Sequence, residues 1–478
     1  MIVTMTDEAT AITLCAEGAV LSDAGDMPAA IARYRDAVAK APGLLPLHLI
    51  LGNAQLLAGD VPGARDTLRR AQRVAERPDA ATEFTLGKAL VDAGAGADAV
   101  PCFRRVRAEL PHDVAAASAL AAALRDAQRP DEAWKEISHA LTLAPDDAVA
   151  LHTAALIRHD LGDFSRALEL VERSLEVRPD SSGTRVTRGY LHHLLGDHEG
   201  GWHDFESRPL PDPQGTSRAW NGEPLDGRSI TLLGEQGTGD QFQFLRFARH
   251  PALRSASRVV ITCHRDAVSL LQAAGYEAVA REERVDTDFH APLLSLPLLL
   301  GLDAAWTDET SCSPYLVLPD AVPARSLKPR RVGVTWAGNP AHRNDAVRSI
   351  PSALLHGLLH THPDLRFVCM QHGVSGHEMP IGRFEPCGGG DWLATARHLL
   401  TLDLLITVDT GIAHLAGALG VPVWIMLPHV PDWRWGAAGN RTPWYPSARL
   451  FRQPARGEWA RVLTSVSAAL SSAEIGAA

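Results

Sequence analysis

Small apolar, bulky apolar and proline positions return at a fixed spacing through the first two hundred residues. Ala99 is followed by Phe103, Val106 and Pro111, at intervals of four, three and five residues. The same spacing recurs in Ala30, Tyr34, Ala37 and Pro42, in Ala133, Ile137, Ala140 and Pro145, and in Ala167, Val171, Ser174 and Pro179. The series that begin at positions 99, 133 and 167 follow one another at intervals of 34 residues. Gly-Asp pairs separate the halves of several of these units.

This spacing predicts a unit of two packed helices. A small alanine lets two helices approach closely, a larger residue one turn later fills the space between them, and proline ends the second helix. One such unit cannot bury its apolar face, so copies stack into a solenoid. The segment resembles the tetratricopeptide repeat, which has a period of about 34 residues. We therefore expect an all-α tetratricopeptide-repeat solenoid of about five to six repeats over residues 1–206.

Such solenoids present an extended concave surface for binding. We expect this surface to bind a protein or peptide, either an acceptor or a partner. The alternative is that the repeats only support the following domain or mediate dimerisation.

The pattern changes after Phe205. Residues 207–228 contain four prolines and three glycines in a polar stretch, which indicates a linker. Beyond it, short apolar runs alternate with helix-length segments, the pattern of a parallel sheet with helices on both faces. We expect an α/β region of two Rossmann-like lobes, at 229–329 and 330–465, followed by a tail at 466–478.

The strands of these lobes are predicted from apolar runs bounded by polar or glycine-containing loops. The runs lie at 229–234, 258–264, 276–280, 331–336, 365–371, 403–409 and 421–427. Ligands in sheets of this kind bind outside the carboxyl ends of the strands. The loops that follow three of these runs therefore contain the candidate chemistry.

The first loop, GEQGTGDQ, follows the run at 229–234. Gly237 and Gly239 allow a tight turn and close approach to a ligand, and the helix that follows favours an anionic group at its N-terminus. The glycine spacing is not that of a dinucleotide-binding loop, and no P-loop lysine follows. Asp240 is a candidate general base directed into the cleft between the lobes. The alternative for this carboxylate is a plain helix cap.

The second loop, WAGNPAHRNDAVRSIP, is long and polar and holds Arg343 and Arg348. Arginine side chains bind phosphate oxygens through paired hydrogen bonds. These two arginines are therefore candidate ligands of a diphosphate, and the alternative is that both are solvated loop residues.

The third loop lies in ITVDTGIAHLAGALG, where Asp409, Thr410 and Gly411 end a strand and begin a helix. The amides of Thr410 and Gly411 would point at a phosphate, and His414 lies one turn further on. A carboxylate beside a diphosphate would be repelled, so Asp409 more plausibly accepts hydrogen bonds from sugar hydroxyls. The alternative is that Asp409 caps the helix and that His414 is an ordinary helix residue.

Residues from about Trp220 to Gln453 resemble glycosyltransferase family nine, the heptosyltransferase-type family. The resemblance is carried by GEQGTGDQFQFLRFA, VGVTWAGNPAHRNDAVRSIP and DLLITVDTGIAHLAGALGVPVWIMLP. The D-T-G-x-x-H run is the most specific of these. The whole chain resembles bacterial tetratricopeptide-repeat proteins that carry such a transferase.

The resemblance implies a GT-B fold and a metal-independent, inverting transfer from a nucleotide-diphospho-sugar to an acceptor hydroxyl. It gives Asp240 the place of the catalytic base, Arg348 a contact to the donor diphosphate, and Asp409 a contact to the sugar. It gives Thr410, Gly411 and His414 contacts to the diphosphate. Gln371 falls near the place where heptosyltransferases carry an acidic residue for the nucleoside. This departure leaves the base and the sugar of the donor undetermined, so ADP-heptose is not assumed.

The composition excludes some classes of function. A net charge of -10 over 478 residues argues against nucleic acid as the main partner. The six cysteines form no C-x-x-C pair, which suits a reducing cytoplasm. The sequence shows no signal peptide, and no run reaches the roughly 18 apolar residues of a membrane span. The D-x-D run at 286–288 lies far from the basic loops, so we expect no metal and no cofactor beyond the co-substrate.

Three hypotheses follow. The first is a cytoplasmic glycosyltransferase whose repeats recruit or position an acceptor. The second is a repeat scaffold whose transferase lobes are degenerate. The third is a lipopolysaccharide-type heptosyltransferase, which leaves the repeats unexplained.

Overall fold

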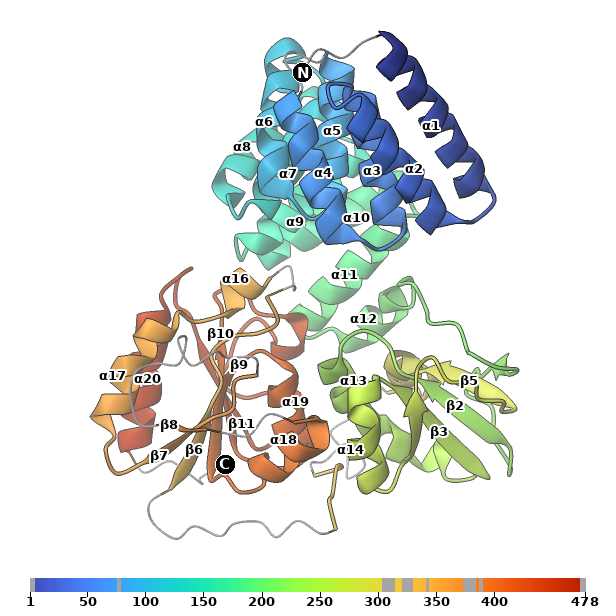
Figure 1. Cartoon of the computed structure of the whole chain (residues 1–478). Helices are drawn as coiled ribbons and strands as arrows, with labels where there is room; N and C mark the ends of the chain where they lie inside the picture. The colour runs from blue at the N-terminus through green and yellow to red at the C-terminus, as the bar shows by residue number, and fades with distance from the viewer. Residues whose placement is uncertain are drawn as a thin grey trace. The chain divides into compact units, whose positions relative to one another are not determined.

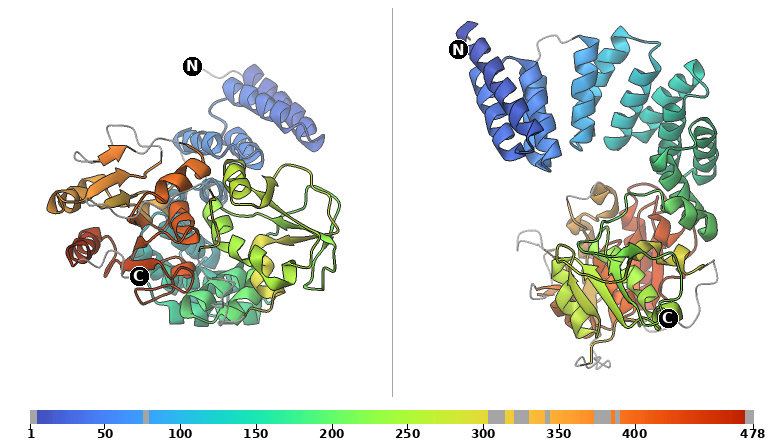
Figure 2. Two further views of the ribbon diagram at one scale, coloured as in Figure 1. Left: turned by 90° about the horizontal axis from the view of Figure 1, so that it is seen from below. Right: turned by 90° about the vertical axis from the view of Figure 1, so that its right-hand side faces the viewer.

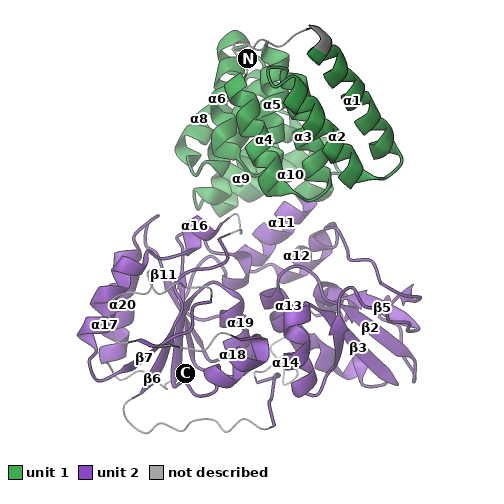
Figure 3. Cartoon of the chain, viewed as in Figure 1, with its two compact units in different colours: residues 1–184 green, residues 185–478 purple. Residues whose placement is uncertain are grey.

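The computed structural model describes residues 5–74, 79–302, 314–319, 330–340, 344–372, 384–386 and 390–472. The chain forms two compact units, Met1–Thr184 and Arg185–Ala478 (Figure 3). The predicted solenoid extends to residue 206, so the first unit ends before that boundary. The helices between residues 185 and 206 group with the second unit.

The first unit is all-helical, and its helices pack as successive antiparallel pairs (Figure 2, right). The helices are α1 (Met5–Asp23), α2 (Met27–Lys40), α3 (Leu45–Leu57), α4 (Val61–Val74), α5 (Ala80–Asp92), α6 (Gly96–Glu109), α7 (Val114–Asp126), α8 (Pro130–Leu143), α9 (Ala148–Asp160) and α10 (Phe164–Val177).

The recurring positions of the sequence form the core of this solenoid. Ala99, Phe103 and Val106 are buried on α6, as are the equivalent residues of α2, α8 and α10. Within a pair, a small residue of the first helix faces a large residue of the second. A Cβ added to Gly87 would lie 2.8 Å from the Phe103 ring, and Gly52 stands in the same relation to Leu68. The predicted close approach of paired helices is confirmed.

The Gly-Asp pairs join the helices within the repeats. Gly162 has a φ of +82°, a backbone conformation that ends a helix and favours glycine. Asp163 follows as the N-cap of α10, and its carboxylate accepts a hydrogen bond from the backbone of Arg166. Gly25 and Asp26 make the same arrangement before α2. Each pair thus stops one helix and starts the next.

The second unit begins within α11 (Ser182–Leu195), continues through α12 (His198–Phe205), and then forms two parallel sheets. The first sheet has the strand order β1-β5-β2-β3-β4. Its strands are β1 (Arg218–Ala219), β2 (Ser229–Leu233), β3 (Arg258–Cys263), β4 (Glu277–Ala280) and β5 (Phe289–Pro292). The short β1 lies inside the predicted linker at 207–228 and pairs with β5.

The second sheet has the order β11-β10-β9-β6-β7-β8. Its strands are β6 (Arg331–Val334), β7 (Arg366–Cys369), β8 (Phe384–Pro386), β9 (Leu404–Val408), β10 (Val423–Leu427) and β11 (Ala448–Arg452). Every pairing in both sheets is parallel. Strands β9 and β10 are fully buried, as continuous apolar runs between two helical layers should be.

Helices cover both faces of the second sheet (Figure 1). On one face lie α17 (Leu355–Thr361) and α20 (Trp459–Ser471), and on the other lie α18 (Trp392–Leu399) and α19 (Gly411–Ala418). Two helices of the first lobe, α13 (Thr238–Phe244) and α14 (Val268–Ala273), pack against α19 and α18. The second unit is therefore α/β, and its two lobes meet through helices.

The seven predicted strands all form, with ends within two residues of the expected ones. Four further strands, β1, β5, β8 and β11, were not predicted, because they are edge strands or carry polar and proline residues. Within the described residues, no helix combines the length and apolar character needed to cross a bilayer.

Candidate functional site

The candidate residues lie where strands of the two lobes end. The loop from Gly234 to Gly237 joins β2 to α13, and Asp409 and Thr410 join β9 to α19. The loop after β6 leads to the short helix α16 (Asp345–Arg348). Because α13 packs on α19, the loops of the first and second lobes come together.

Gly239 and Gly411 lie against each other where the starts of α13 and α19 meet. A Cβ added to Gly239 would lie 2.9 Å from the Cα of Gly411 and 3.0 Å from Cδ2 of His414. A Cβ added to Gly411 would lie 3.2 Å from the ring of Trp392. Both glycines thus permit two helix N-termini to touch, and the close approach of Gly239 to a ligand stays a prediction.

Asp240 stands in the first turn of α13, and its carboxylate has two partners. One oxygen accepts a hydrogen bond from the Gly237 N–H at 2.8 Å, so Asp240 supports the start of α13 from its first turn without being the N-cap considered as its alternative role. The other oxygen lies 2.5 Å from a guanidinium nitrogen of Arg434 in the second lobe. The Asp240 side chain is 20% exposed, so the carboxylate still reaches solvent. Gly237 itself is the exposed N-cap of the helix.

Arg434 is the central cation of this site, and the sequence analysis did not single it out. Its guanidinium is 8% exposed and contacts Asp240, Asp432 at 2.9 Å and the Gln243 side-chain oxygen at 2.9 Å. Burial lowers the pKa of Arg434, but the carboxylates of Asp240 and Asp432 raise it more, so the guanidinium stays charged. The flanking residue Trp433 is buried in the core.

Asp409 follows β9 directly and lies among other charged groups. Burial and the charge of Asp432 raise the pKa of Asp409 to about 6, although Trp435, Arg348 and Arg434 favour the carboxylate. Its backbone carbonyl accepts a hydrogen bond of 3.1 Å from Arg348. Asp409 therefore changes protonation close to neutral pH, unlike an ordinary aspartate.

Arg348 connects α16 to this loop. It donates to the Asp409 carbonyl, and its Nε lies 3.5 Å from Asp345. The guanidinium also lies across Gly338, where an added Cβ would be 2.6 Å from one of its nitrogens. The structure thus brings Arg348 beside Asp409, and the contact of Arg348 with a diphosphate stays a prediction. Arg343 lies outside the described residues.

Thr410 and His414 belong to the first turns of α19. Thr410 is the N-cap, and its hydroxyl donates to the Val408 carbonyl at 3.3 Å and makes no cap bond. His414 is buried, stacks on Trp435 with ring centroids 5.2 Å apart, and shares a 2.9 Å hydrogen bond with the Tyr445 hydroxyl. Burial and the charge of Arg434 lower the pKa of His414 to about 3, so the imidazole is neutral.

Gln371 follows β7 and braces the loop after β6. Its side-chain oxygen accepts hydrogen bonds from the backbone of Trp336 and Ala337, and its amide donates to the Ala337 carbonyl. This side chain therefore fixes the start of the loop that leads to Arg348. Its contact with a nucleoside stays a prediction.

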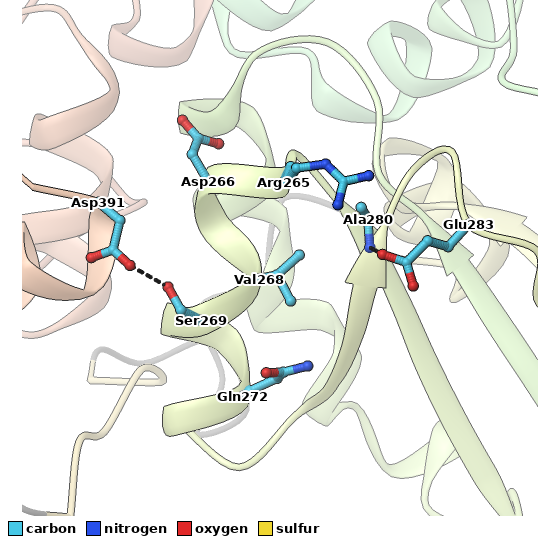
Figure 4. Close-up of a pocket in the computed structure, with 8 residues that line it drawn as sticks. All are labelled: Arg265, Asp266, Val268, Ser269, Gln272, Ala280, Glu283 and Asp391. Carbon is cyan, nitrogen blue, oxygen red and sulfur yellow. Dashed lines mark hydrogen bonds between the residues drawn. The ribbon is translucent and has the colours of Figure 1, made fainter.

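A pocket of about 350 Å³ lies beside the two lobes' contact, at the carboxyl ends of β3 and β4 (Figure 4). Arg265, Ser269 and Glu283 line it from the first lobe, and Asp391 lines it from the N-terminus of α18. Asp391 accepts a 2.7 Å hydrogen bond from Ser269, which ties the lobes together at the pocket. The residue after Asp391, Trp392, lies outside the pocket lining and packs close to Gly411.

The described residues contain no group of three or more His, Cys, Asp or Glu side chains arranged to hold a metal. The D-x-D carboxylates have structural partners instead. Asp286 accepts hydrogen bonds from Thr216 and Arg284, and Asp288 accepts them from Ser229. These contacts fasten the segment before β5 to the edge of the first sheet.

Comparison with known proteins assigns the first unit. Residues 15–81 and 84–148 match the family model of the tetratricopeptide repeat. The amino-terminal region is therefore a tetratricopeptide-repeat solenoid, as the spacing predicted. Repeats of this family indicate a peptide or protein partner, or a scaffold role.

Protein FlbA of Caulobacter vibrioides is 24% identical over 328 residues, which cover 56% of this chain. The chain spans about half the length of this curated relative, 52%. Among solved structures, YrrB, described as a TPR protein with an unusual peptide-binding site, is 21% identical with a TM-score of 0.30. The matched region covers 36% of this chain and 89% of the YrrB chain. A tetratricopeptide repeat protein from Parabacteroides merdae is 15% identical with a TM-score of 0.33, over 42% of this chain and 77% of its own.

Proposed function

We propose that the second unit is a GT-B glycosyltransferase that moves a sugar from a nucleotide-diphospho-sugar to an acceptor hydroxyl. In this proposal the repeats recruit a protein or peptide acceptor. The observation that supports it most directly is the contact of α13 with α19, because it brings Asp240 of one lobe together with Asp409 and Arg348 of the other.

The donor would lie at the N-terminus of α19. Backbone amides at a helix N-terminus attract phosphate, and Arg348 adds a guanidinium next to Asp409. Asp409, with its pKa raised to about 6, would bond sugar hydroxyls without fully opposing the diphosphate charge. The neutral, buried His414 would orient the helix start rather than carry charge.

The transfer is a single displacement. The acceptor oxygen forms a bond to the anomeric carbon while the bond from that carbon to the diphosphate oxygen breaks. The acceptor proton passes to the Asp240 carboxylate, and the nucleoside diphosphate leaves with the bonding electron pair. Arg348 and the helix N-terminus stabilise the charge that develops on the leaving group, so this step uses no metal.

The second candidate is a repeat scaffold with degenerate lobes. The pairing of Asp240 with both Gly237 and Arg434 favours it, because a carboxylate held by two donors is also a good structural brace. A lipopolysaccharide-type heptosyltransferase remains a third candidate, and it would require a glycolipid acceptor.

A donor screen tests the proposal. Purified full-length protein is incubated with a panel of nucleotide-diphospho-sugars, and both the thermal shift and the release of nucleoside diphosphate are recorded. We expect at least one donor to raise the melting temperature and to be turned over. A donor that binds but is never turned over, with or without candidate acceptors, would favour the scaffold.

A further inference from the structure

The last helix pair, α11 and α12, packs on the segment that carries Arg434. Trp433 stacks on Tyr190 with ring centroids 6.3 Å apart and planes 13° apart, and on His193 at 4.6 Å. Trp202 meets the same indole edge-on at 5.8 Å. A backbone hydrogen bond of 3.0 Å from Ala437 to the Leu194 carbonyl fixes the register of the two segments.

Trp433 in turn holds Arg434. The Arg434 guanidinium lies over the Trp433 ring at 4.4 Å, a distance typical of a cation–π contact. The same guanidinium reaches Asp240 at 2.5 Å and Gln243 at 2.9 Å. Continuous contacts therefore run from α11, through an indole and a guanidinium, to the carboxylate in α13.

Tyr190 also lies within electrostatic range of the site. Burial raises the pKa of Tyr190. The charge of Arg434 lowers this pKa, and the charges of Asp432 and Asp240 raise it. Both Trp433 and His193 are nearly fully buried, at 6% and 1% exposed, so the stack has little freedom to rearrange. Packed interiors of this kind transmit small displacements.

We propose that Tyr190 is a positioning residue for the proposed transfer, acting through Trp433 and Arg434 on the carboxylate of Asp240. The helix pair α11 and α12 is then a working part of the site. The kinetic test of this inference rests on the proposed function. Its second test, a double-mutant cycle of stability, rests on packing alone.

The kinetic test compares Tyr190→Leu, Tyr190→Phe and the control Phe164→Leu in the full-length protein. Phe164 also packs beside a histidine, His159, at 5.6 Å, but it lies in the first unit. We expect Tyr190→Leu to lower kcat for nucleoside diphosphate release about tenfold, because small misplacements of a reacting group are costly. We expect Tyr190→Phe, which keeps the stack, to stay near the wild-type rate, and Phe164→Leu to do the same.

A second rate comparison separates positioning from simple loss of folded protein. If Tyr190 acts through the Asp240 carboxylate, Tyr190→Leu lowers kcat in the wild-type background and has little further effect in an Asp240→Asn background. Fewer folded molecules would lower kcat by the same factor in both backgrounds. Equal factors in the two backgrounds would overturn the inference.

A double-mutant cycle needs no activity. Melting temperatures are measured for Tyr190→Leu, Arg434→Met, the double variant and the wild type. Coupled residues give a double variant whose loss differs from the sum of the single losses, whereas independent residues give additive losses. If no donor is turned over, the proposed function fails, yet non-additivity still supports the contact path. Additive losses would refute it whatever the donor screen gives.

Discussion

Gly239 and Gly411 face each other across the two lobes with no side chain between them. A Cβ on the first would approach the Cα of the second to 2.9 Å, closer than such atoms come in folded proteins. The two helix starts are therefore held by backbone contact, and the distance between Asp240 and Asp409 depends on it. Any side chain added here must push the lobes apart.

Gly239→Val should destabilise the second unit. The added side chain meets the backbone of Gly411, which cannot move away as a flexible side chain can, and overpacking of this kind costs about 1–3 kcal/mol. A lower melting temperature by calorimetry is expected. Gly357→Ala is the matched control, because nothing lies within 4 Å of its added Cβ. Equal melting temperatures for Gly239→Val and the wild type would contradict the close contact.

Asp240→Asn should lower nucleoside diphosphate release by about a hundredfold or more, since it removes the proposed base while keeping its shape. Asp432→Asn is the control, because it removes the other carboxylate that pairs with Arg434 and keeps the proposed base, Asp240. Its loss of rate should be clearly smaller. Equal losses would show that Asp240 acts only by pairing with Arg434, and unchanged turnover in Asp240→Asn would remove the base assignment.

Asp409→Asn should stabilise the protein relative to the wild type, and this gain should be larger at pH 8 than at pH 5. The pKa of Asp409 rises to about 6 in the folded protein from an ordinary value of 3.8. A carboxyl with a raised pKa binds more protons when folded, so its stabilising contribution is present at low pH and is lost as the pH rises through 6. The amide cannot ionise. We expect the difference in melting temperature between variant and wild type to grow from pH 5 to pH 8, and a constant difference would argue against the raised pKa.

His193→Phe should make the melting temperature less sensitive to acid. Burial and the neighbouring charges lower the pKa of His193 to about 2 from 6.5. Its stabilising contribution is present above pH 6.5 and is lost as the pH falls, because the unfolded chain takes up the proton. At pH 5 the free energy of unfolding that is lost in this way amounts to about 2 kcal/mol. Phenylalanine keeps the ring against Trp433, and His356→Phe, at a half-buried position of α17, is the control.

A fragment of residues 185–478 should fold, whereas a fragment of residues 207–478 should not. The shorter fragment lacks the side chains that cover Trp433, namely Tyr190, His193, Trp202 and Phe205. It also lacks the hydrogen bond from Ala437 to Leu194. Near-ultraviolet circular dichroism and a cooperative melt distinguish the two. Cooperative unfolding of the shorter fragment would show that the last helix pair is dispensable.

The solenoid and most strands could be predicted from the sequence because their signals are local. Ala99, Phe103 and Val106 are buried as their spacing requires, and β9 and β10 are buried along their whole length as their apolar runs require. Local spacing also placed Asp240 and Asp409 at strand ends. It could not place β5, whose FHAP sequence is short and contains histidine and proline.

The partners of the candidate residues could not be predicted, because they come from distant positions. Arg434 lies 194 residues from Asp240, and only the folded chain joins them. The sequence around Arg434 showed two tryptophans and no pattern for the arginine between them. Likewise, the packing of α11 on Trp433 depends on tertiary contacts, which the solenoid period does not contain.

The boundary at Thr184 has an evolutionary consequence. Repeats arise and disappear in whole copies by duplication and deletion of coding sequence. The side chains that stack on Trp433 come from α11 and α12, so a change in the number of upstream copies leaves these residues in the chain. Descendants of one ancestral fusion could therefore differ in repeat number while inheriting the same junction.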